Sequence, residues 1–221
     1  MNGVLAFWRS AIGKKVVMAV TGIIGIAFLI VHVAGNLLVF RGPAAMNGYS
    51  AMLHGPAAEL LWVARVVLLA AVILHVIAAW QLTQQDHAAR QIKYAVKRPQ
   101  QATLAARVMR WGGVLLLVFI VFHILHFTTG TIRPGGTFYP GDVYANVVTA
   151  FHIWWVALFY LVAMVFLGLH LYHGGWSSVR TLGVTGDPRN PFRRRIAGLI
   201  AVVVWLGFSL VPLGVLLGWV R

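Results

Sequence analysis

Five segments of this 221-residue chain are each long and apolar enough to cross a lipid bilayer. A bilayer core of about 30 Å requires about 20 apolar residues in a helix. A membrane β-barrel would need short strands of alternating hydrophobicity instead. We therefore predict an all-α, polytopic membrane protein of five transmembrane helices, forming one domain over residues 1–221. The predicted spans cover about residues 16–40, 60–82, 108–130, 147–174 and 196–220.

The composition excludes several other classes of protein. Hydrophobic residues make up 60% of the chain and charged residues only 10%, whereas soluble domains carry about 25% charged residues. A disordered chain is excluded by this apolar content, and the basic residues lie between apolar runs, so we expect no nucleic-acid partner. The chain has no cysteine, which excludes thiolate zinc sites, iron–sulfur ligation and a cysteine nucleophile.

The basic residues are concentrated in alternate loops. Of the 18 Lys and Arg residues, 14 lie in the N-terminal segment, between the second and third spans, or between the fourth and fifth. Cytoplasmic loops carry such an excess, so we predict a cytoplasmic N-terminus and a C-terminus outside. The first apolar run is too long for the core of a signal peptide, and we expect it to be a retained helix.

Histidine is the unusual residue of the predicted spans, because ionisable side chains are costly inside a bilayer and are usually functional there. Helices rise about 1.5 Å per residue, so His32 and His123 lie at a similar depth in the outer half. His75 and His170 lie in the inner half. Of the nine histidines in the chain, seven are in or near spans: His32, His75, His123, His126, His152, His170 and His173.

Two histidines at one depth on different helices can ligate one metal ion from opposite sides. Haem iron with two axial histidines fits this arrangement, whereas a zinc site needs four ligands in total and lacks acidic or thiolate partners here. Gly22 and Gly25, which precede His32, would allow a large planar group to approach. A simple helix-packing seam is the alternative for these glycines.

His126 and His173 lie three residues after His123 and His170 and share their helix faces. Because they are nearer the span ends, we expect them to bond a propionate, a quinone or a backbone carbonyl. The alternative that His126 replaces His123, or that His173 replaces His170, as a metal ligand stays open.

Five stretches together resemble the single-chain cytochrome b anchor of succinate:quinone oxidoreductases and fumarate reductases, of the dihaem b558 type. The resemblance covers nearly the whole chain, and the stretches occur in the order of the family pattern. They are IGKKVVMAVTG (12–22), VHVAGNL (31–37), ILHVIAA (73–79), FHILHFT (122–128) and GLHLYHGGWS (168–177).

The resemblance implies five helices that hold two b haems, one above the other across the membrane. It implies His75 and His170 as axial ligands of the inner haem iron, and His32 and His123 as those of the outer one. This pairing agrees with the depths of the four residues.

The resemblance also implies partners and a location. A flavoprotein subunit and an iron–sulfur subunit would dock on the cytoplasmic side of a bacterial cytoplasmic membrane. Electrons would pass through the haems to or from a quinone, usually menaquinone. A dimer or trimer of such complexes is possible in principle, and the chain itself would not bind succinate.

Related anchors bind the quinone near the outer haem. Here Glu59 or His54 would exchange protons with it, and Arg65 would bind a haem propionate. Arg9 and Ser10 are the corresponding propionate candidates near the inner haem. The alternatives are that Glu59 only stabilises the first turn of a helix and that the Arg65 side chain extends its charged group to the outer membrane interface.

Two other functions remain as alternatives. One is the cytochrome b anchor of another quinone-linked dehydrogenase, which commonly has four spans. The other is a transporter whose histidines relay protons without haem. Such a transporter usually has paired interruptions in its helices, whereas here only the fifth span contains a proline, Pro212, where we expect a kink.

Overall fold

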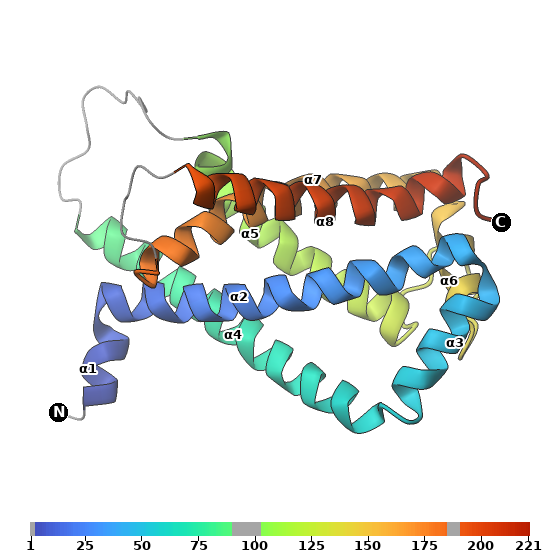
Figure 1. Cartoon of the computed structure of the whole chain (residues 1–221), viewed down its shortest axis with the longest axis horizontal. Coiled ribbons are helices and arrows are strands. Elements are labelled where there is room, and N and C mark those ends of the chain that lie inside the picture. The colour runs from blue at the N-terminus through green and yellow to red at the C-terminus, as the bar shows by residue number, and fades with distance from the viewer. Residues whose placement is uncertain (1–2, 90–102, 185–190) are drawn as a thin grey trace.

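The computed structural model of the chain describes residues 3–89, 103–184 and 191–221 (Figure 1). Five of its helices are long and apolar enough to cross a membrane, which confirms the predicted all-α, five-helix membrane architecture. No strand occurs in the described part. The spanning segments are α2 (Ala11–Asn36) continued by the 3-10 turn η1 (Leu37–Arg41), α4 (Ala58–Ala88), α5 (Leu104–His123) continued by the π-helical turn η2 (Ile124–Thr128), α7 (Trp154–Thr181) and α8 (Phe192–Leu216).

Three shorter helices lie at the two ends of the bundle. α1 (Gly3–Arg9) precedes α2 at one end, which we call the α1 end. At the other end, called the α6 end, are α3 (Pro43–His54) and α6 (Val143–Phe151). The N-terminus lies at the α1 end and the C-terminus at the α6 end (Figure 1). The sequence predicted a loop where α3 forms, and a loop followed by the start of the fourth span where α6 forms, because both helices are too short to stand out as separate apolar segments.

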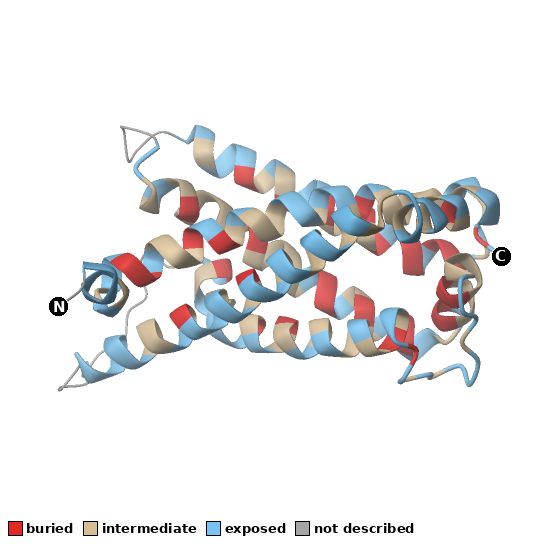
Figure 2. Ribbon diagram, turned by 90° about the horizontal axis from the view of Figure 1, so that it is seen from below, coloured by how far each residue is buried: buried red, intermediate tan, exposed pale blue. Residues whose placement is uncertain are grey.

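Exposed residues line the outside of the bundle (Figure 2), and many of them are large and apolar. Leu60 is 69% exposed and Leu199 65%, a pattern that water would disfavour and lipid satisfies. The indole rings of Trp62 and Trp80, near the two ends of α4, are also largely exposed. Their 18-residue separation corresponds to about 27 Å, close to the thickness of a bilayer core. Aromatic residues at both membrane interfaces are typical of transmembrane helices.

The spans differ from their predicted bounds because apolar composition does not mark where a helix ends. The predicted fourth span includes residues 147–153, but there the chain forms the end of α6 and turns at His152 and Ile153 before α7. α8 stays helical through Pro212 and ends at Leu216. Its end is fixed by Gly218 with a φ of 73° and by N–H bonds from Gly218 and Trp219 to the last turn, the pattern of a Schellman cap.

Close helix packing depends on small residues. Gly207 of α8 lies so near Val33 of α2 that a Cβ atom there would collide with the Val33 side chain. Gly168 of α7 packs on Trp205 of α8. A Cβ atom added at Gly168 would lie 3.3 Å from the Cβ atom of Trp205. Such contacts bring α2, α7 and α8 together and leave α4 and α5 to complete the bundle on the other side.

Candidate functional site

Four histidines from four helices meet as two pairs inside the bundle. The ring centroids of His75 on α4 and His170 on α7 are 6.1 Å apart. Those of His32 on α2 and His123 on α5 are 5.9 Å apart. The structure thus brings together the residues that their depths paired, and their role as ligands stays a prediction.

The spacing of each pair suits a metal ion between the two rings. An imidazole nitrogen lies about 2.0–2.1 Å from a bound metal ion and about 1.1 Å from its own ring centre, so two opposed rings have centroids about 6.2–6.4 Å apart. A direct N–H···N bond of about 2.9 Å would bring the centroids to about 5.1 Å. The observed separations are nearer the first value, and they also lie within the range of about 4.5–7 Å of ordinary ring contacts.

Haem fits the donor set better than a bare ion does. In the described part of the chain, no three His, Asp or Glu side chains gather as a potential metal site. Each pair therefore supplies two ligands, which is too few for a structural zinc ion. A haem brings its own equatorial nitrogens and needs only the two axial ligands.

Small residues leave room beside the rings of His75 and His170. A Cβ atom on Gly22 would lie 3.6 Å from Cε1 of His75, and one on Gly113 would lie 3.8 Å from Cε1 of His170. A Cβ atom on Gly25 would meet nothing within 4 Å. The glycines thus bring helix backbone next to two of the rings without a clash, and room for a haem beside them stays a prediction.

Thr21 favours the tautomer of His75 that carries its hydrogen on Nδ1. Its hydroxyl oxygen lies 3.0 Å from Nδ1 of His75 and donates to the carbonyl of Val17 at 2.7 Å. Because a hydroxyl has one hydrogen, its oxygen is left to accept the Nδ1–H of His75. In that tautomer Nε2 carries the lone pair and is free to bind metal. By contrast, Nδ1 of His170 is buried and finds no partner among the described residues.

His126 forms a hydrogen-bonded cluster next to the other pair. Its Nδ1 lies 3.0 Å from the hydroxyl of Tyr160, and that hydroxyl lies 3.5 Å from Nδ1 of His123. His126 is only 5% exposed, and its ring stacks on Phe127. The structure thus places His126 beside a predicted ligand and against Tyr160, rather than opposite another histidine.

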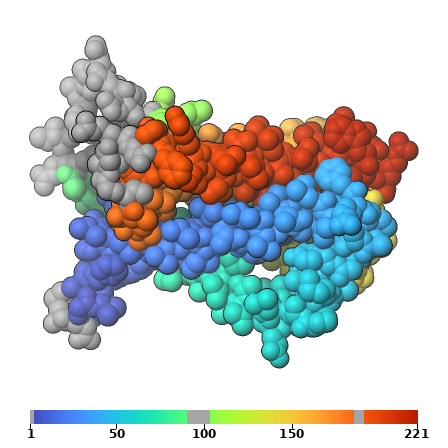
Figure 3. Space-filling model, in the orientation of Figure 1, coloured from blue at the N-terminus to red at the C-terminus, as the bar shows by residue number. Residues whose placement is uncertain are grey.

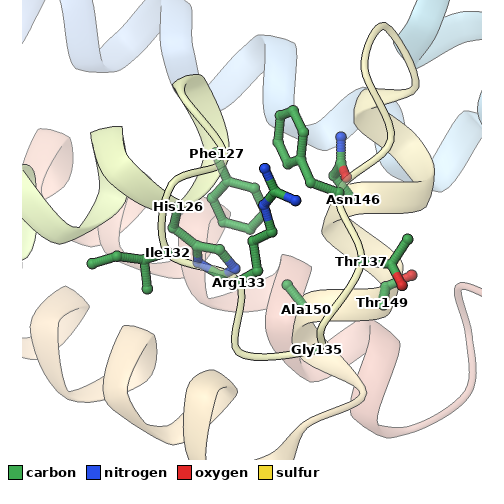
Figure 4. Close-up of a pocket in the computed structure, with 10 residues that line it drawn as sticks. His126, Phe127, Ile132, Arg133, Gly135, Thr137, Asn146, Thr149 and Ala150 are labelled. Carbon is green, nitrogen blue, oxygen red and sulfur yellow. The ribbon is translucent and has the colours of Figure 1, made fainter.

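A small polar pocket lies beside His126 at the α6 end (Figure 4). Arg133, Thr149 and Asn146 contribute polar groups to its wall. The Asn146 side chain is engaged, since it exchanges two hydrogen bonds of 2.8 Å with the backbone of Tyr139. Nε of Arg133 donates to the carbonyl of Gly130.

The residues predicted to serve the quinone are only partly together. Nη2 of Arg65 lies 3.3 Å from Nε2 of His54, and its guanidinium group lies 5.0 Å from the centre of the Trp62 ring. Glu59 is exposed on the first turn of α4 and forms no ion pair among the described residues. The structure therefore pairs Arg65 with His54 and leaves Glu59 apart.

The propionate candidates at the α1 end are in different situations. The Ser10 hydroxyl accepts from the Gly13 N–H at 2.9 Å and donates to the Phe7 carbonyl at 2.7 Å, so it is used as a helix cap. Arg9 is exposed. His173 has a buried Nδ1 without a partner in the described part, and its ring contacts Trp176 at 5.2 Å.

Thr21 and Tyr160 were missed by sequence reasoning. Each is a polar side chain inside an apolar helix, which is a usable signal. Their partners, however, lie 54 and 37 residues away in the sequence, so only the fold reveals the pairing.

No known protein family, curated protein or solved structure matches this chain.

Proposed function

We propose that this chain is the membrane anchor and electron-transfer subunit of a succinate:quinone oxidoreductase or fumarate reductase. In this proposal, it holds two b haems, each between two histidines. The observation that carries the proposal is that four histidines from four helices form two facing pairs, His32 with His123 and His75 with His170. The motif order of the sequence supports the choice of enzyme.

The two sites would lie one above the other across the membrane. Thr21 bonds to His75 of one pair, and His32 of the other pair is eleven residues further along the same helix. Eleven residues correspond to about 16 Å along α2, which is about half of a bilayer core.

The chain's own residues would bind and orient the cofactors. His75 and His170 would hold one haem iron, and His32 and His123 the other. Thr21 keeps Nε2 of His75 available, and the apolar helices exclude water from both sites. When bound, the haems would supply one-electron transfer between the other subunits and the quinone.

The proposal assigns the partners to opposite ends of the bundle. A flavoprotein and an iron–sulfur subunit would dock at the α1 end, on the cytoplasmic side of a bacterial membrane. Menaquinone would react near the α6 end, with Glu59 or His54 exchanging protons and Arg65 binding a propionate. His126, His173, Arg9 and Ser10 would contact propionates or ligands.

Haem content is the decisive measurement. The reduced-minus-oxidised spectrum of the purified complex should show b-type haem, with about two haems per chain. His75→Ala and His123→Ala should each remove one haem. His152→Ala is the matched control, because this exposed histidine belongs to neither pair and lies against the carbonyl of Val148. Absence of haem, or two haems in both ligand variants, would overturn the proposal.

The two alternatives give different results in the same preparation. A proton-relaying transporter would show no visible absorption. The anchor of another quinone-linked dehydrogenase would contain haem, but succinate would not reduce it in the complex. Succinate-driven reduction of the haems, with a co-purifying flavoprotein, is the expected outcome.

A further inference from the structure

The first helix is held firmly across the end of the bundle. α1 turns away from the axis of α2 (Figure 1), and its last carbonyls are bonded by side chains. Nζ of Lys14 donates to the carbonyls of Trp8 at 2.8 Å and Arg9 at 3.0 Å. Nε2 of Gln85, from α4, also donates to the Arg9 carbonyl at 3.1 Å. These hydrogen bonds satisfy the carbonyl groups at the C-terminus of α1 and fix the direction of this helix.

Close backbone contact completes this corner. The position of a Cβ atom on Gly13 would overlap the carbonyl of Phe7, so only glycine permits α1 to fold against α2 here. Lys14 is 3% exposed, which is unusual for a lysine unless its charge is satisfied. Specific contacts therefore hold the turn between α1 and α2, and α1 is a separate helix and not a frayed extension of α2.

The surface of α1 is apolar although it is exposed. Its sequence is GVLAFWR, in which Arg9 is the sole polar residue. Val4 is 79% exposed, Leu5 52% and Phe7 46%. The helix protrudes beyond the outline of the bundle (Figure 3), and it points away from α8 (Figure 1). A helix that protrudes into water would be expected to carry a polar face.

The depth of α1 along the bundle matches a lipid headgroup layer. Trp80 of α4, 65% exposed, marks the interfacial aromatic level at this end. Gln85, which bonds to α1, is five residues further along α4, or about 7 Å. The headgroup region on each side of a bilayer core is about 5–7 Å thick.

We infer that α1 is an interfacial helix, which lies parallel to the membrane plane and binds lipid through Val4, Leu5 and Phe7. Helices of this kind bury their apolar face about 5–10 Å into the boundary between headgroups and acyl chains. The lipid-covered surface of the spanning helices continues into α1 through Ile12, which is 73% exposed. Arg9 and Lys15, both exposed, would meet anionic headgroups. This inference does not depend on haem binding.

A single introduced cysteine tests the inference, because the natural chain has none. Spin labels on Val4→Cys and Phe7→Cys would be studied in the full chain, reconstituted in vesicles of phosphatidylcholine and phosphatidylglycerol. The readout is the collision rate with oxygen, which is concentrated in lipid, relative to that with a water-soluble nickel complex. Ala88→Cys, exposed near the end of α4, is the aqueous control. Val118→Cys, on the exposed middle of α5, is the lipid control.

The oxygen-to-nickel ratio at Val4 and Phe7 should be several times that at Ala88 and below that at Val118. A ratio equal to that at Ala88 would overturn the inference. So would a label that is aqueous in vesicles and becomes protected only when another subunit is added, since α1 would then be a protein-docking helix. Adding Val4→Asp to the Phe7 label should lower its ratio, because a charged residue weakens lipid insertion.

Discussion

At the scale of single residues, several polar groups inside this bundle have specific partners. Thr21 bonds to His75, and Tyr160 lies between His126 and His123. Outside the spans, Asn47 of α3 donates to Asp142 at 2.8 Å and accepts from the Tyr144 N–H at 3.0 Å. A buried polar group without a partner is costly, so these few residues determine which helix surfaces face one another.

Thr21→Val should change the electronic environment of one proposed haem. Valine keeps the shape of threonine but cannot accept the Nδ1–H of His75, which makes the imidazole a weaker donor to ferric iron. The reduction potential of that haem should rise, by up to about 60 mV if a hydrogen bond of about 1.4 kcal/mol is lost. Potentiometric titration would measure it. Thr21→Ser should leave the potential near its original value, and an unchanged potential in the valine variant would contradict the assignment.

Asp142 should make a pH-dependent contribution to stability. The backbone N–H of Ala145, and then the Asn47 side chain, lower the pKa of this carboxyl group below its usual value. The contribution is therefore full above the usual carboxyl pKa of about 3.9 and is lost as pH falls through the lowered native value.

Asp142→Ala should cost about 1 kcal/mol at pH 7, the usual effect of losing an N-cap, and less at pH 3. Thermal unfolding of the protein in detergent at the two pH values would measure this. Asp142→Asn can still accept from Ala145 and should show a smaller loss than the alanine variant at pH 7, and this loss should also shrink at pH 3. An equal loss for the alanine variant at both values would contradict the role of the charge.

At the scale of helices, glycine decides how closely neighbouring elements approach. Gly207 allows α8 to contact Val33 of α2, and Gly13 allows α1 to turn against α2. Val33 is β-branched and has little rotamer freedom in a helix, so it cannot move aside for an added methyl group.

Gly207→Ala should destabilise the protein by about 1–3 kcal/mol through overpacking. Gly48→Ala is the matched control, because a Cβ atom at this helical position would meet nothing within 4 Å. That control should be neutral or stabilising by up to about 1 kcal/mol. The measurement is the melting temperature in detergent, and equal effects of the two substitutions would contradict the packing argument.

At the scale of the whole molecule, an apolar surface surrounds a bundle whose described basic side chains gather mostly at the α1 end. The Asp86 carboxylate bonds to Arg110 at 2.9 Å, which ties α4 to α5 at that end. The remaining excess of positive charge favours the cytoplasmic side of a membrane.

Labelling of intact cells would test this orientation. A cysteine at Ala44, exposed on α3 at the α6 end, should react with a maleimide that cannot cross the membrane. A cysteine at Ala88, near the α1 end, should react only after the cells are permeabilised. The reverse pattern would show that the N-terminus is outside.

The number of spans and the paired depths of the histidines were predictable from the sequence, because they depend on local composition and on the constant rise of a helix. The helix ends at Phe151 and Leu216, and the short helices α1, α3 and α6, were not predictable in this way. They depend on caps and on bonds between distant residues, such as Asn47 with Asp142.

Local composition is enough to require that the five apolar segments cross a bilayer as helices, since a bilayer leaves few other ways to satisfy the backbone. The positions of the histidines within these segments also predict their depths. The packing of the helices was needed to show that His75 lies beside His170, with ring centroids 6.1 Å apart, and that Thr21 lies against Nδ1 of His75. The direction in which a side chain points between helices depends on how those helices rotate and pack, and contacts far apart in the sequence set that rotation.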